Sequence, residues 1–367
     1  MVAPVPWFPS RWSGFGEYAT LARTPEREQR HGIDVQHPRY LVIPKVGMRM
    51  QPSSLAVAGI RSARALRKEG FDFDVIDAHY FYPDGVAARI MSSVLGKPFV
   101  VTARGSDLNL IAESTFARRL IVDAAREAAS VICVSSALRN RAIEIGMSAD
   151  HVEVLRNGVD TSLFAPRDRR KSREALQLGA SGGPVLLCVG NLVPEKGYDL
   201  AVRALMSLPG ASLVMIGRGP ERTRLQSLAM QLGVESRLRF IDEMPQSELA
   251  LAYSAADVLL LTSMREGWPN VLLEAMACGT PVVAIDVGGV REIVSSPIAG
   301  RVLSERSPET LAVEIESLLV RPPSRDAVRR HAMEFGWRGV VERQLELLTT
   351  AAHGARERFV NTSTELH

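Results

Sequence analysis

The feature that most constrains the fold is a repeated alternation of short apolar segments with longer helical ones. Apolar runs in the first half predict strands at Tyr40–Ile43, Asp74–His79, Pro98–Ala103, Ser130–Ser135 and Val152–Arg156. Segments with a helical pattern lie between them, for example Pro83–Leu95 and Phe116–Ala129. Repetition of strand, helix and strand predicts a parallel sheet covered by helices on both faces.

The alternation is interrupted by the segment 165–184. It is charged, then helical, and ends in Ser-Gly-Gly-Pro, so it predicts a connection between two domains. A second series of predicted strands follows at Val185–Gly190, Ser212–Gly217, Leu238–Asp242, Asp257–Ser263 and Pro281–Asp286. We therefore expect an α/β chain with two doubly wound, Rossmann-like domains, at 1–164 and 185–333. Ligands of such sheets bind at the carboxyl ends of strands, so the cleft between the domains is the expected site.

Composition and charge exclude several classes of protein. The chain has 367 residues, 46% hydrophobic and 23% charged, which is globular and long enough for two domains. A net charge of +3 without an aromatic-studded basic stripe argues against nucleic acid as a partner. The three cysteines (Cys133, Cys188 and Cys278) are isolated in apolar runs and are interpreted as buried hydrophobes in a reducing compartment. The histidines form no ligand-like cluster and no apolar run is long enough to span a bilayer, which predicts a cytoplasmic protein without a structural metal.

The start of the chain departs from the usual order of a doubly wound domain. The stretch "VAPVPWFPS" resembles the end of a strand running into a Pro-rich loop, and a first βα unit is apparently missing before Met1. Either the domain has an unusual edge or the chain begins downstream of the natural start.

A basic stripe lies on the predicted helix at Ala58–Gly70. Arg61, Arg64 and Lys68 fall on one face of it, with Arg67 near. The stripe suits either a solvated helix face or peripheral contact with the anionic inner face of the cell membrane.

A helix start with polar neighbours occurs in "REGWPNVLLEAMACGTPVVA". Gly267 lies in the loop after a predicted strand, and Pro269 suits the first turn of the next helix because it has no N–H to lose. The amides of Asn270, Val271 and Leu272 would then be unpaired at the positive end of the helix dipole. Such a helix start is a favourable site for a phosphate group.

Two glutamates bracket this helix start. Glu266 in the loop is close enough to accept hydrogen bonds from the hydroxyls of a ligand, and Glu274 can reach another part of the same ligand. A nucleotide sugar has this layout, with hydroxyls on both sides of a diphosphate. The alternative interpretation is a loop charge at Glu266 and a solvent-facing helix residue at Glu274.

Two further strand ends repeat this arrangement. In "VGNLVPEKGYDL" a turn at Gly190 and Asn191 is followed by Lys196, which precedes a helix start and is well placed for phosphate oxygens. The alternative is an exposed loop lysine. In "IGRGPE", Gly217 and Gly219 would let the backbone approach a ligand closely.

These segments together resemble the retaining glycosyltransferases of family 4, which have the GT-B fold. "EGWPNVLLEAMACGTPVVA" is similar to the E-x7-E signature of that family, and "VGNLVPEKG", "IGRGPE", "LRNGVDTSLF" and "VGGVREIV" have its order and spacing. The resemblance covers roughly residues 1–350 and implies a closing helix at 334–350 that packs back towards the N-terminal domain, followed by a tail at 351–367.

The resemblance also implies roles for the site residues. Glu266 would contact the donor sugar, Glu274 would hold the ribose, and Lys196 would bind the diphosphate. The family needs no metal ion and no cofactor, so "DFD" at Asp72–Asp74 is interpreted as a loop before a strand rather than a metal-binding motif.

Two departures from the family pattern concern positive charge. Asn191 stands where the family usually has an arginine, so diphosphate binding depends on Lys196, the helix start or another arginine such as Arg218. Arg104 stands where many members have a histidine, within a "T-x-R-G-S-D" segment that resembles a subgroup linked to exopolysaccharide or cell-envelope synthesis. Arg104 would bind a phosphate or sugar carboxylate, or else form a structural ion pair with Asp107.

One more candidate lies at the end of a strand in the same domain. His79 is predicted to contact the acceptor or donor, with Asp107 as a second acceptor-side candidate, although a histidine satisfied within the fold is an equal alternative.

The sequence thus predicts a metal-independent retaining glycosyltransferase with Glu266, Lys196 and Arg104 as its catalytic residues. It would move a hexose-type sugar from a nucleotide diphosphate to a glycan or lipid-linked acceptor in exopolysaccharide or cell-envelope synthesis. The alternative is a non-catalytic or N-terminally truncated sugar-nucleotide-binding GT-B protein. A GT-B epimerase is a further alternative, against which the E-x7-E arrangement argues.

Overall fold

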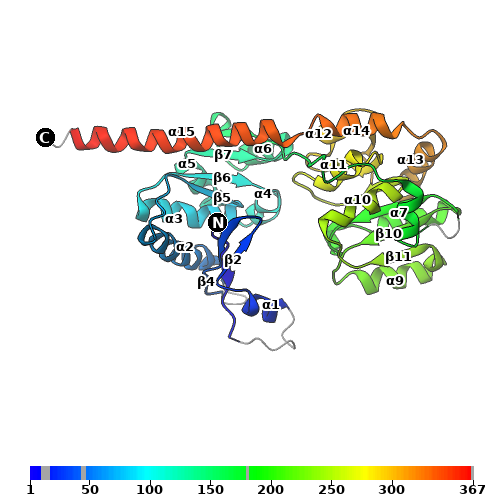
Figure 1. The fold of residues 1–367 in the computed structure, drawn as a ribbon, viewed down its shortest axis with the longest axis horizontal. Coiled ribbons are helices and arrows are strands. Elements are labelled where there is room, and N and C mark those ends of the chain that lie inside the picture. Colours follow the sequence, from blue (N-terminus) through cyan, green and yellow to red (C-terminus); the bar gives the residue numbers. More distant parts are fainter. Residues whose placement is uncertain (10–16, 43–46, 179–181, 365–367) are drawn as a thin grey trace. The chain divides into compact units, whose positions relative to one another are not determined.

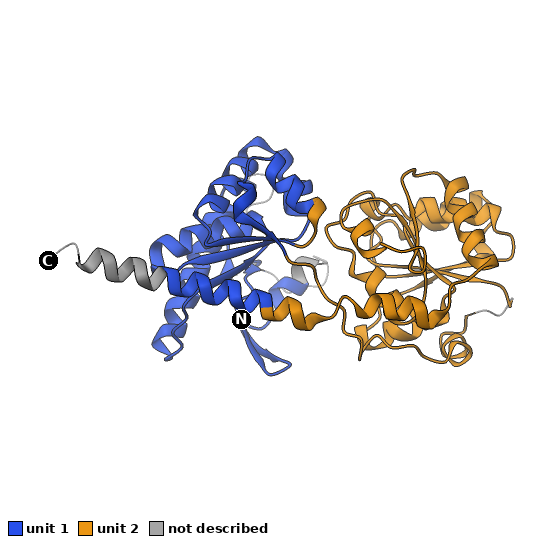
Figure 2. Ribbon diagram, turned by 90° about the horizontal axis from the view of Figure 1, so that it is seen from above, with its two compact units in different colours: residues 1–133, 138–154, 343–367 blue, residues 134–137, 155–342 orange. Residues whose placement is uncertain are grey.

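The computed structural model describes residues 1–9, 17–42, 47–178 and 182–364. These residues divide into two compact units, shown in Figure 2. The N-terminal unit comprises Met1–Cys133, Leu138–Val154 and Arg343–His367, and the C-terminal unit comprises Val134–Ala137 and Leu155–Glu342. Parts of three predicted segments lie outside the described residues: Ile43 of the first strand, 179–181 of the connection and 365–367 of the tail.

The units divide at other points than the domain boundaries expected from the sequence. Apart from Val134–Ala137, the chain passes to the C-terminal unit after Val154, whereas residue 164 was expected to end the first domain. Val159 explains the difference, because it forms a parallel β-bridge with Gly336 and so joins the C-terminal unit. The chain returns to the N-terminal unit after Glu342, within the helix expected to begin at residue 334.

A six-stranded parallel sheet forms the centre of the C-terminal unit (Figure 1). In spatial order it contains β11 (Leu238–Ile241), β10 (Ser212–Ile216), β9 (Val185–Val189), β12 (Val258–Leu261), β13 (Val282–Ile285) and β14 (Gly300–Leu303). All but β14 lie within the strands predicted from apolar runs. β12 and β13 are buried throughout because parallel sheets have helices on both faces.

The direction of winding reverses in the middle of this sheet. The chain proceeds outward from β9 to β10 and β11, then returns to β12 on the other side of β9. The helices of the unit are α7 (Arg169–Ala175), α8 (Asp199–Ala204), α9 (Arg222–Gln231), α10 (Gln246–Ala255), α11 (Asn270–Ala277), α12 (Val290–Ile293), α13 (Pro308–Val320) and α14 (Arg325–Met333). The carboxyl ends of β9 and β12 therefore flank a topological switch point, where open α/β sheets bind ligands.

The N-terminal unit is built on a four-stranded parallel sheet. Its order is β5 (Ile76–His79), β6 (Phe99–Ala103), β7 (Ser130–Cys133) and β8 (Val152–Val154). The helices are α2 (Gln51–Lys68), α3 (Val86–Leu95), α4 (Ser106–Asn109), α5 (Thr115–Glu127) and α6 (Ser136–Glu144), with a π-helix, η3 (Phe81–Gly85), after β5. These strands and α3 lie in the segments that the sequence predicted, and α5 begins one residue before its predicted segment.

The first forty residues contain elements that the sequence did not predict. A helix, α1 (Glu17–Arg23), precedes an antiparallel hairpin of β2 (Arg27–Arg30) and β3 (Ile33–Gln36). The hairpin turn has positive φ at His31 and Gly32, which suits the right-handed twist of paired strands. The predicted strand at Tyr40 is reduced to β4 (Arg39–Tyr40), which pairs in parallel with β1 (Val5–Pro6).

Two helices of the N-terminal unit carry the remaining sequence-based predictions. On α2, Arg61, Arg64 and Lys68 are exposed, so the basic stripe exists as a surface feature. The closing helix is α15 (Trp337–Thr364). Arg343, in its second turn, makes an ion pair with both carboxylate oxygens of Glu153 at 2.7 and 2.8 Å, so the helix contacts the N-terminal unit there. Among the described helices none has the length and apolarity needed to cross a membrane.

Candidate active site

Two loops at the switch point hold each other in place. The loop after β9 contains the 3₁₀ turn η6 (Pro194–Lys196), and the loop after β12 begins at Thr262. The Thr262 hydroxyl donates a hydrogen bond to the carbonyl of Lys196 at 2.9 Å, and the amide of Met264 donates to the carbonyl of Glu195 at 2.8 Å. The two loops therefore behave as one rigid edge of the sheet.

Lys196 and Glu266 meet at this edge. The Lys196 Nζ donates to Glu266 Oε1 at 2.7 Å, and the Ser263 hydroxyl donates to the same oxygen, also at 2.7 Å. The two charged side chains are only 28% and 13% exposed, so the pair is half-buried. Lys196 is therefore not the exposed loop lysine of the alternative interpretation, and Glu266 is a loop carboxylate held by these two donors.

Glycines make the close packing of these loops possible. Gly190, Gly217 and Gly219 all have φ between +141° and +155°, where other residues are strained. A Cβ added to Gly217 would lie 2.9 Å from the carbonyl carbon of Gly190, and one added to Gly219 would lie 2.6 Å from that of Leu192. The sequence predicted that Gly217 and Gly219 let the backbone approach a ligand. In the structure they let the loop after β10 approach the backbone of the loop after β9. A Cβ on Gly190 would lie 3.7 Å from Lys196 Cε, so this glycine borders the lysine side chain.

The helix α11 begins one residue later than the sequence predicted. Pro269 is its N-cap, and Asn270 is its first residue. The expectation that the Leu272 amide is unpaired is wrong, because it donates to the Pro269 carbonyl at 3.1 Å. The first amides of the helix are therefore those of Asn270 and Val271.

The motif segments of the C-terminal unit converge on the loop before α11. The buried Trp268 donates from its indole Nε1 to the carbonyl of Asn157 at 3.1 Å. The amide of Gly289 donates to the carbonyl of Gly267 at 3.1 Å. Gly288 has φ of +56°, and a Cβ there would lie 2.7 Å from the carbonyl carbon of Glu266. The segments at Asn157 and Gly288 thus fix the path of the loop that presents Glu266.

Glu274 has a partner that the sequence did not indicate. Its Oε2 accepts a hydrogen bond of 2.6 Å from the hydroxyl of Tyr253, a fully buried side chain of α10. Burial raises the pKa of Glu274 above its usual range, against the opposing effect of this hydrogen bond. The alternative of a solvent-facing helix residue is wrong, since Glu274 is half-buried and held in one orientation.

The two other candidates for diphosphate binding, Asn191 and Arg218, follow β9 and β10. Asn191 is exposed in the turn after β9, and its carbonyl accepts from the amide of Val193 at 2.9 Å. Arg218 is 67% exposed and lies 3.8 Å from Asp242, which also binds Arg222 at 2.6 Å. The structure thus joins Arg218 to the end of β11, and its role toward a diphosphate stays a prediction.

Arg306 is a residue of this edge that the sequence analysis missed. Its Nη1 donates to the carbonyls of Thr262 and Ser263, the latter at 3.0 Å, and its Cζ lies 3.4 Å from the position of a Cβ on Gly197. Arg306 follows β14, the strand that the sequence did not predict, so no signal placed it at the site. It adds a second cation to the loops that carry Lys196.

In the N-terminal unit, His79 and Arg104 come together. An Nη2 of Arg104 lies 2.6 Å from His79 Nδ1, and His79 Nε2 lies 3.4 Å from Asp77. Burial lowers the pKa of Arg104, and the charge of Asp77 opposes this effect. The strand-end histidine and the arginine that were predicted separately therefore form one polar cluster.

Asp107 shapes the loop that carries Arg104. Its carboxylate accepts hydrogen bonds from the amides of Phe81 at 2.9 Å, Gly105 at 2.8 Å and Arg104 at 3.2 Å. The side chain has no exposed surface, so its proposed acceptor contact is wrong and it acts on the site through the backbone.

Asp84, beside this cluster, was also missed. It lies in η3, and burial, with a smaller contribution from the charge of Asp107, raises the pKa of Asp84 to about 6. The only sequence signal was its position in "FYPDG", which resembles an ordinary turn.

Replacing Asp84 by asparagine should change how stability depends on pH. The native pKa lies about 2 units above the unfolded value of 3.8, so stability falls by about 3 kcal/mol as pH rises from 3.8 to about 6. Asp84→Asn cannot titrate at this position and lacks this decrease. The difference in free energy of unfolding between Asp84→Asn and the wild type, measured in urea, should therefore shift in favour of the variant as pH rises from about 4 to 7. Asp150→Asn, at an exposed aspartate of the same unit, should follow the wild type. Parallel pH curves for Asp84→Asn and wild type would contradict the prediction.

Comparison with known proteins agrees with this architecture. Residues 168–335 match the family described as "Glycosyl transferases group 1", and residues 17–163 match "Glycosyltransferase Family 4". A D-inositol 3-phosphate glycosyltransferase of Acidothermus cellulolyticus is 35% identical over 312 residues, which cover 78% of this chain and 68% of that protein. That of Catenulispora acidiphila is 31% identical over 328 residues, with 82% and 78% covered. The chain spans 63% of the length of the similar protein from Mycobacterium bovis.

Solved structures show the same fold. The structure of Anabaena Alr3699/HepE in complex with UDP-glucose superposes with a TM-score of 0.76 at 23% identity, covering 95% of this chain and 91% of that one. Sucrose-phosphate synthase from Thermosynechococcus elongatus gives a TM-score of 0.75 at 21% identity, covering 92% and 87%. The architecture is therefore GT-B, with two Rossmann-like units. The chain belongs to the group 1, or family 4, glycosyltransferases.

Proposed function

We propose that the chain transfers a hexosyl group from a nucleotide diphosphate sugar to an acceptor hydroxyl, with retention at the anomeric carbon and without a metal ion. The observation that carries this proposal is the half-buried Lys196–Glu266 pair at the switch point between β9 and β12. It places a cation for phosphate and an acceptor of sugar hydroxyl hydrogen bonds within 2.7 Å of each other.

The proposed chemistry uses these groups in different ways. The acceptor hydroxyl attacks the anomeric carbon on the face of the departing diphosphate, whose oxygen takes the hydroxyl proton as the sugar–phosphate bond breaks. Lys196 and the start of α11 stabilise the charge that develops on the diphosphate. Glu266 positions the sugar and forms no bond to it. Glu274, fixed by Tyr253, accepts hydrogen bonds from the ribose.

We assign the polar cluster of the N-terminal unit to the acceptor or to the donor phosphate. Arg104 carries its charge half-buried beside His79, and a planar guanidinium is suited to bidentate recognition of phosphate or carboxylate. A cation at this point favours an acceptor that bears negative charge.

Two classes of acceptor follow from different observations. The relatives at 31–35% identity are named as D-inositol 3-phosphate glycosyltransferases, which favours a phosphorylated cyclitol. The "TARGSD" segment and the basic stripe of α2 favour a glycan or lipid-linked acceptor of cell-envelope synthesis at a membrane surface.

A donor and acceptor screen tests the proposal. The purified chain should release nucleoside diphosphate from one of the UDP- or GDP-hexoses, faster when D-inositol 3-phosphate or a lipid-linked glycan is added, and at an unchanged rate in EDTA. UDP-glucose is the first donor to test, because the structure of HepE contains it. Retention is measured by NMR of the anomeric proton of the product.

The outcomes separate the candidates. A donor that shifts the melting temperature but is neither hydrolysed nor transferred would indicate a sugar-nucleotide-binding protein rather than an enzyme. Loss of activity in EDTA, restored by a divalent ion, would contradict the metal-independent mechanism.

A further inference from the structure

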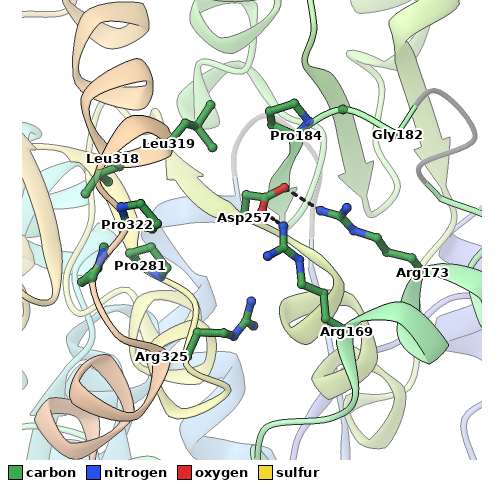
Figure 3. A pocket seen from close by; sticks show the side chains of 12 residues that line it. Arg169, Arg173, Gly182, Pro184, Asp257, Pro281, Leu318, Leu319, Pro322 and Arg325 are labelled. Carbon is green, nitrogen blue, oxygen red and sulfur yellow. Dashed lines mark hydrogen bonds and ion pairs between the residues drawn. The ribbon is translucent and has the colours of Figure 1, made fainter.

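A cavity of about 420 Å³ lies at the opposite edge of the C-terminal sheet from Lys196 and Glu266 (Figure 3). Pro184, Asp257 and Pro281, which line it, immediately precede β9, β12 and β13, so they mark the amino ends of these strands. The remaining walls come from α7, the end of α13 and the start of α14. The cavity is thus built within one unit, and none of the predicted donor residues lines it.

One side of the cavity is an arginine cluster around a single carboxylate. Asp257 pairs with Arg169 through one oxygen, and its other oxygen accepts from Arg173 Nη2 at 2.6 Å and from the amide of Val185 at 2.7 Å. Figure 3 shows both arginines reaching Asp257 from α7. The carboxylate is 12% exposed and already has several donors, so it does not neutralise a further cation.

Arg325 adds a third guanidinium from the first residue of α14. It donates to the carbonyl of Ser254 at 3.1 Å and to the Thr280 hydroxyl at 2.8 Å, which fixes its position without neutralising its charge. Three arginines and one aspartate are the charged residues of the lining, so the cavity carries a net charge of +2. Burial, followed by repulsion from Arg169 and Arg325, lowers the pKa of Arg173.

The facing wall is apolar. In Figure 3, Leu318, Leu319, Pro322 and Pro281 lie across the cavity from Arg169 and Arg173. These side chains offer no hydrogen-bonding group, so a fully hydrated inorganic ion would leave this wall without a partner. A ligand that joins an anionic group to an apolar one would contact the arginines with the first and the apolar wall with the second.

We propose that this cavity binds a phosphorylated small molecule, with its phosphate against Arg169 and its apolar part against Leu319 and the prolines. Phosphate oxygens match the planar donors of guanidinium groups, and a dianion offsets the net charge of the cluster. Arg169 is the principal ligand contact because its side chain is 44% exposed, whereas Arg173 is 19% exposed.

The competing explanation is a purely structural arginine cluster that ties α7 to the sheet. Arg173 fits that role, because its Nε also donates to the Ala255 carbonyl at 2.9 Å at the end of α10. Arg173 and the Val185 amide satisfy one oxygen of Asp257, and Arg169 pairs with the other. The Arg169 side chain is nevertheless 44% exposed, and its guanidinium has five N–H donors, more than this one pair uses. The two explanations therefore differ at Arg169.

Binding of phenyl phosphate by the full chain, followed by ligand-detected NMR, tests the proposal. Phenyl phosphate should bind more tightly than inorganic phosphate, and phenol should not bind. Arg169→Gln should weaken phenyl phosphate about tenfold or more, since it removes a charge-assisted hydrogen bond. Arg169→Lys should lose less, and Leu319→Ala should abolish the preference for phenyl phosphate over inorganic phosphate.

Matched controls locate the site. Arg170→Gln on the same helix, where the side chain is 85% exposed and pairs with Glu174, should bind as the wild type does. Lys196→Ala should also bind normally, so the result does not depend on the proposed transferase function. Undetectable binding to the wild type, unchanged binding in Arg169→Gln, or loss of binding in Lys196→Ala would each overturn the proposal.

Discussion

Lys196→Ala should lower kcat/KM for sugar transfer by about 10²–10³-fold, the loss found when one preorganised electrostatic group is removed from a transition state. Lys196 is fixed at its carbonyl by Thr262 and at its ammonium by Glu266, so its charge needs little reorganisation during the reaction. Glu266→Gln should cause a comparable loss, because the amide keeps the size of the side chain but not its negative charge. Initial rates with a saturating acceptor measure both effects.

Stability measurements separate this effect from a structural one. Removing one member of the half-buried pair should cost about 1–2 kcal/mol in the free energy of unfolding, less than for a fully buried pair, since Ser263 still binds Glu266. Lys171→Ala, which removes an exposed lysine of the same unit, should retain both activity and stability. Full transfer activity in folded Lys196→Ala or Glu266→Gln would contradict the assignment of the active site.

Gly217→Ala should destabilise the C-terminal unit by about 3–5 kcal/mol and abolish donor binding. The added Cβ would collide with the carbonyl group of Gly190, which is backbone and cannot rotate away. The φ of +144° adds strain of its own. Separation of the β9 and β10 loops to relieve the collision would shift the loop of Lys196. Urea unfolding and calorimetric titration with the donor measure the two effects.

Two other glycines of the same unit provide graded controls. At Gly233, φ is +67° but the added Cβ meets open space, so Gly233→Ala should cost only about 1–2 kcal/mol. At Gly210 the space is open and no positive φ is required, so Gly210→Ala should stay within about 0.5 kcal/mol of the wild type. A loss at Gly217 no larger than at Gly233 would show that the collision does not determine the effect.

The sequence predicted the central strands of the sheets well because these strands are buried on both faces. A run such as Val258–Leu261 is apolar without alternation, and this local pattern is sufficient to indicate a parallel strand. The rule that parallel strands present their carboxyl ends at one edge then placed Lys196 and Glu266 near each other. The hairpin at 27–36 escaped prediction because "REQR" has neither apolar content nor alternation, and only its turn carries a signal.

What the sequence could not predict are contacts between residues far apart in the chain. Nothing local marks Tyr253 as the partner of Glu274, or Arg306 as a neighbour of Thr262. The raised pKa of Asp84 arises from burial, which depends on the packing of several elements. The Asn157 contact with Trp268 likewise draws residues 155–164 into the C-terminal unit, a tertiary effect with no signature in composition.

In the proposed donor site, the contact between Glu266 and Lys196 would compete with the ligand for the lysine. The Glu266 carboxylate accepts a hydrogen bond from the Lys196 ammonium group at 2.7 Å, as a phosphate oxygen would. An anion with a single charge gains little by replacing it, because one charge-assisted hydrogen bond is exchanged for another of the same kind. A ligand gains binding free energy only if it also contacts the first amides of α11 and donates a hydroxyl hydrogen bond to Glu266. If the site binds the donor as proposed, the ion pair would select against simple anions and in favour of a molecule bearing both a diphosphate and a sugar.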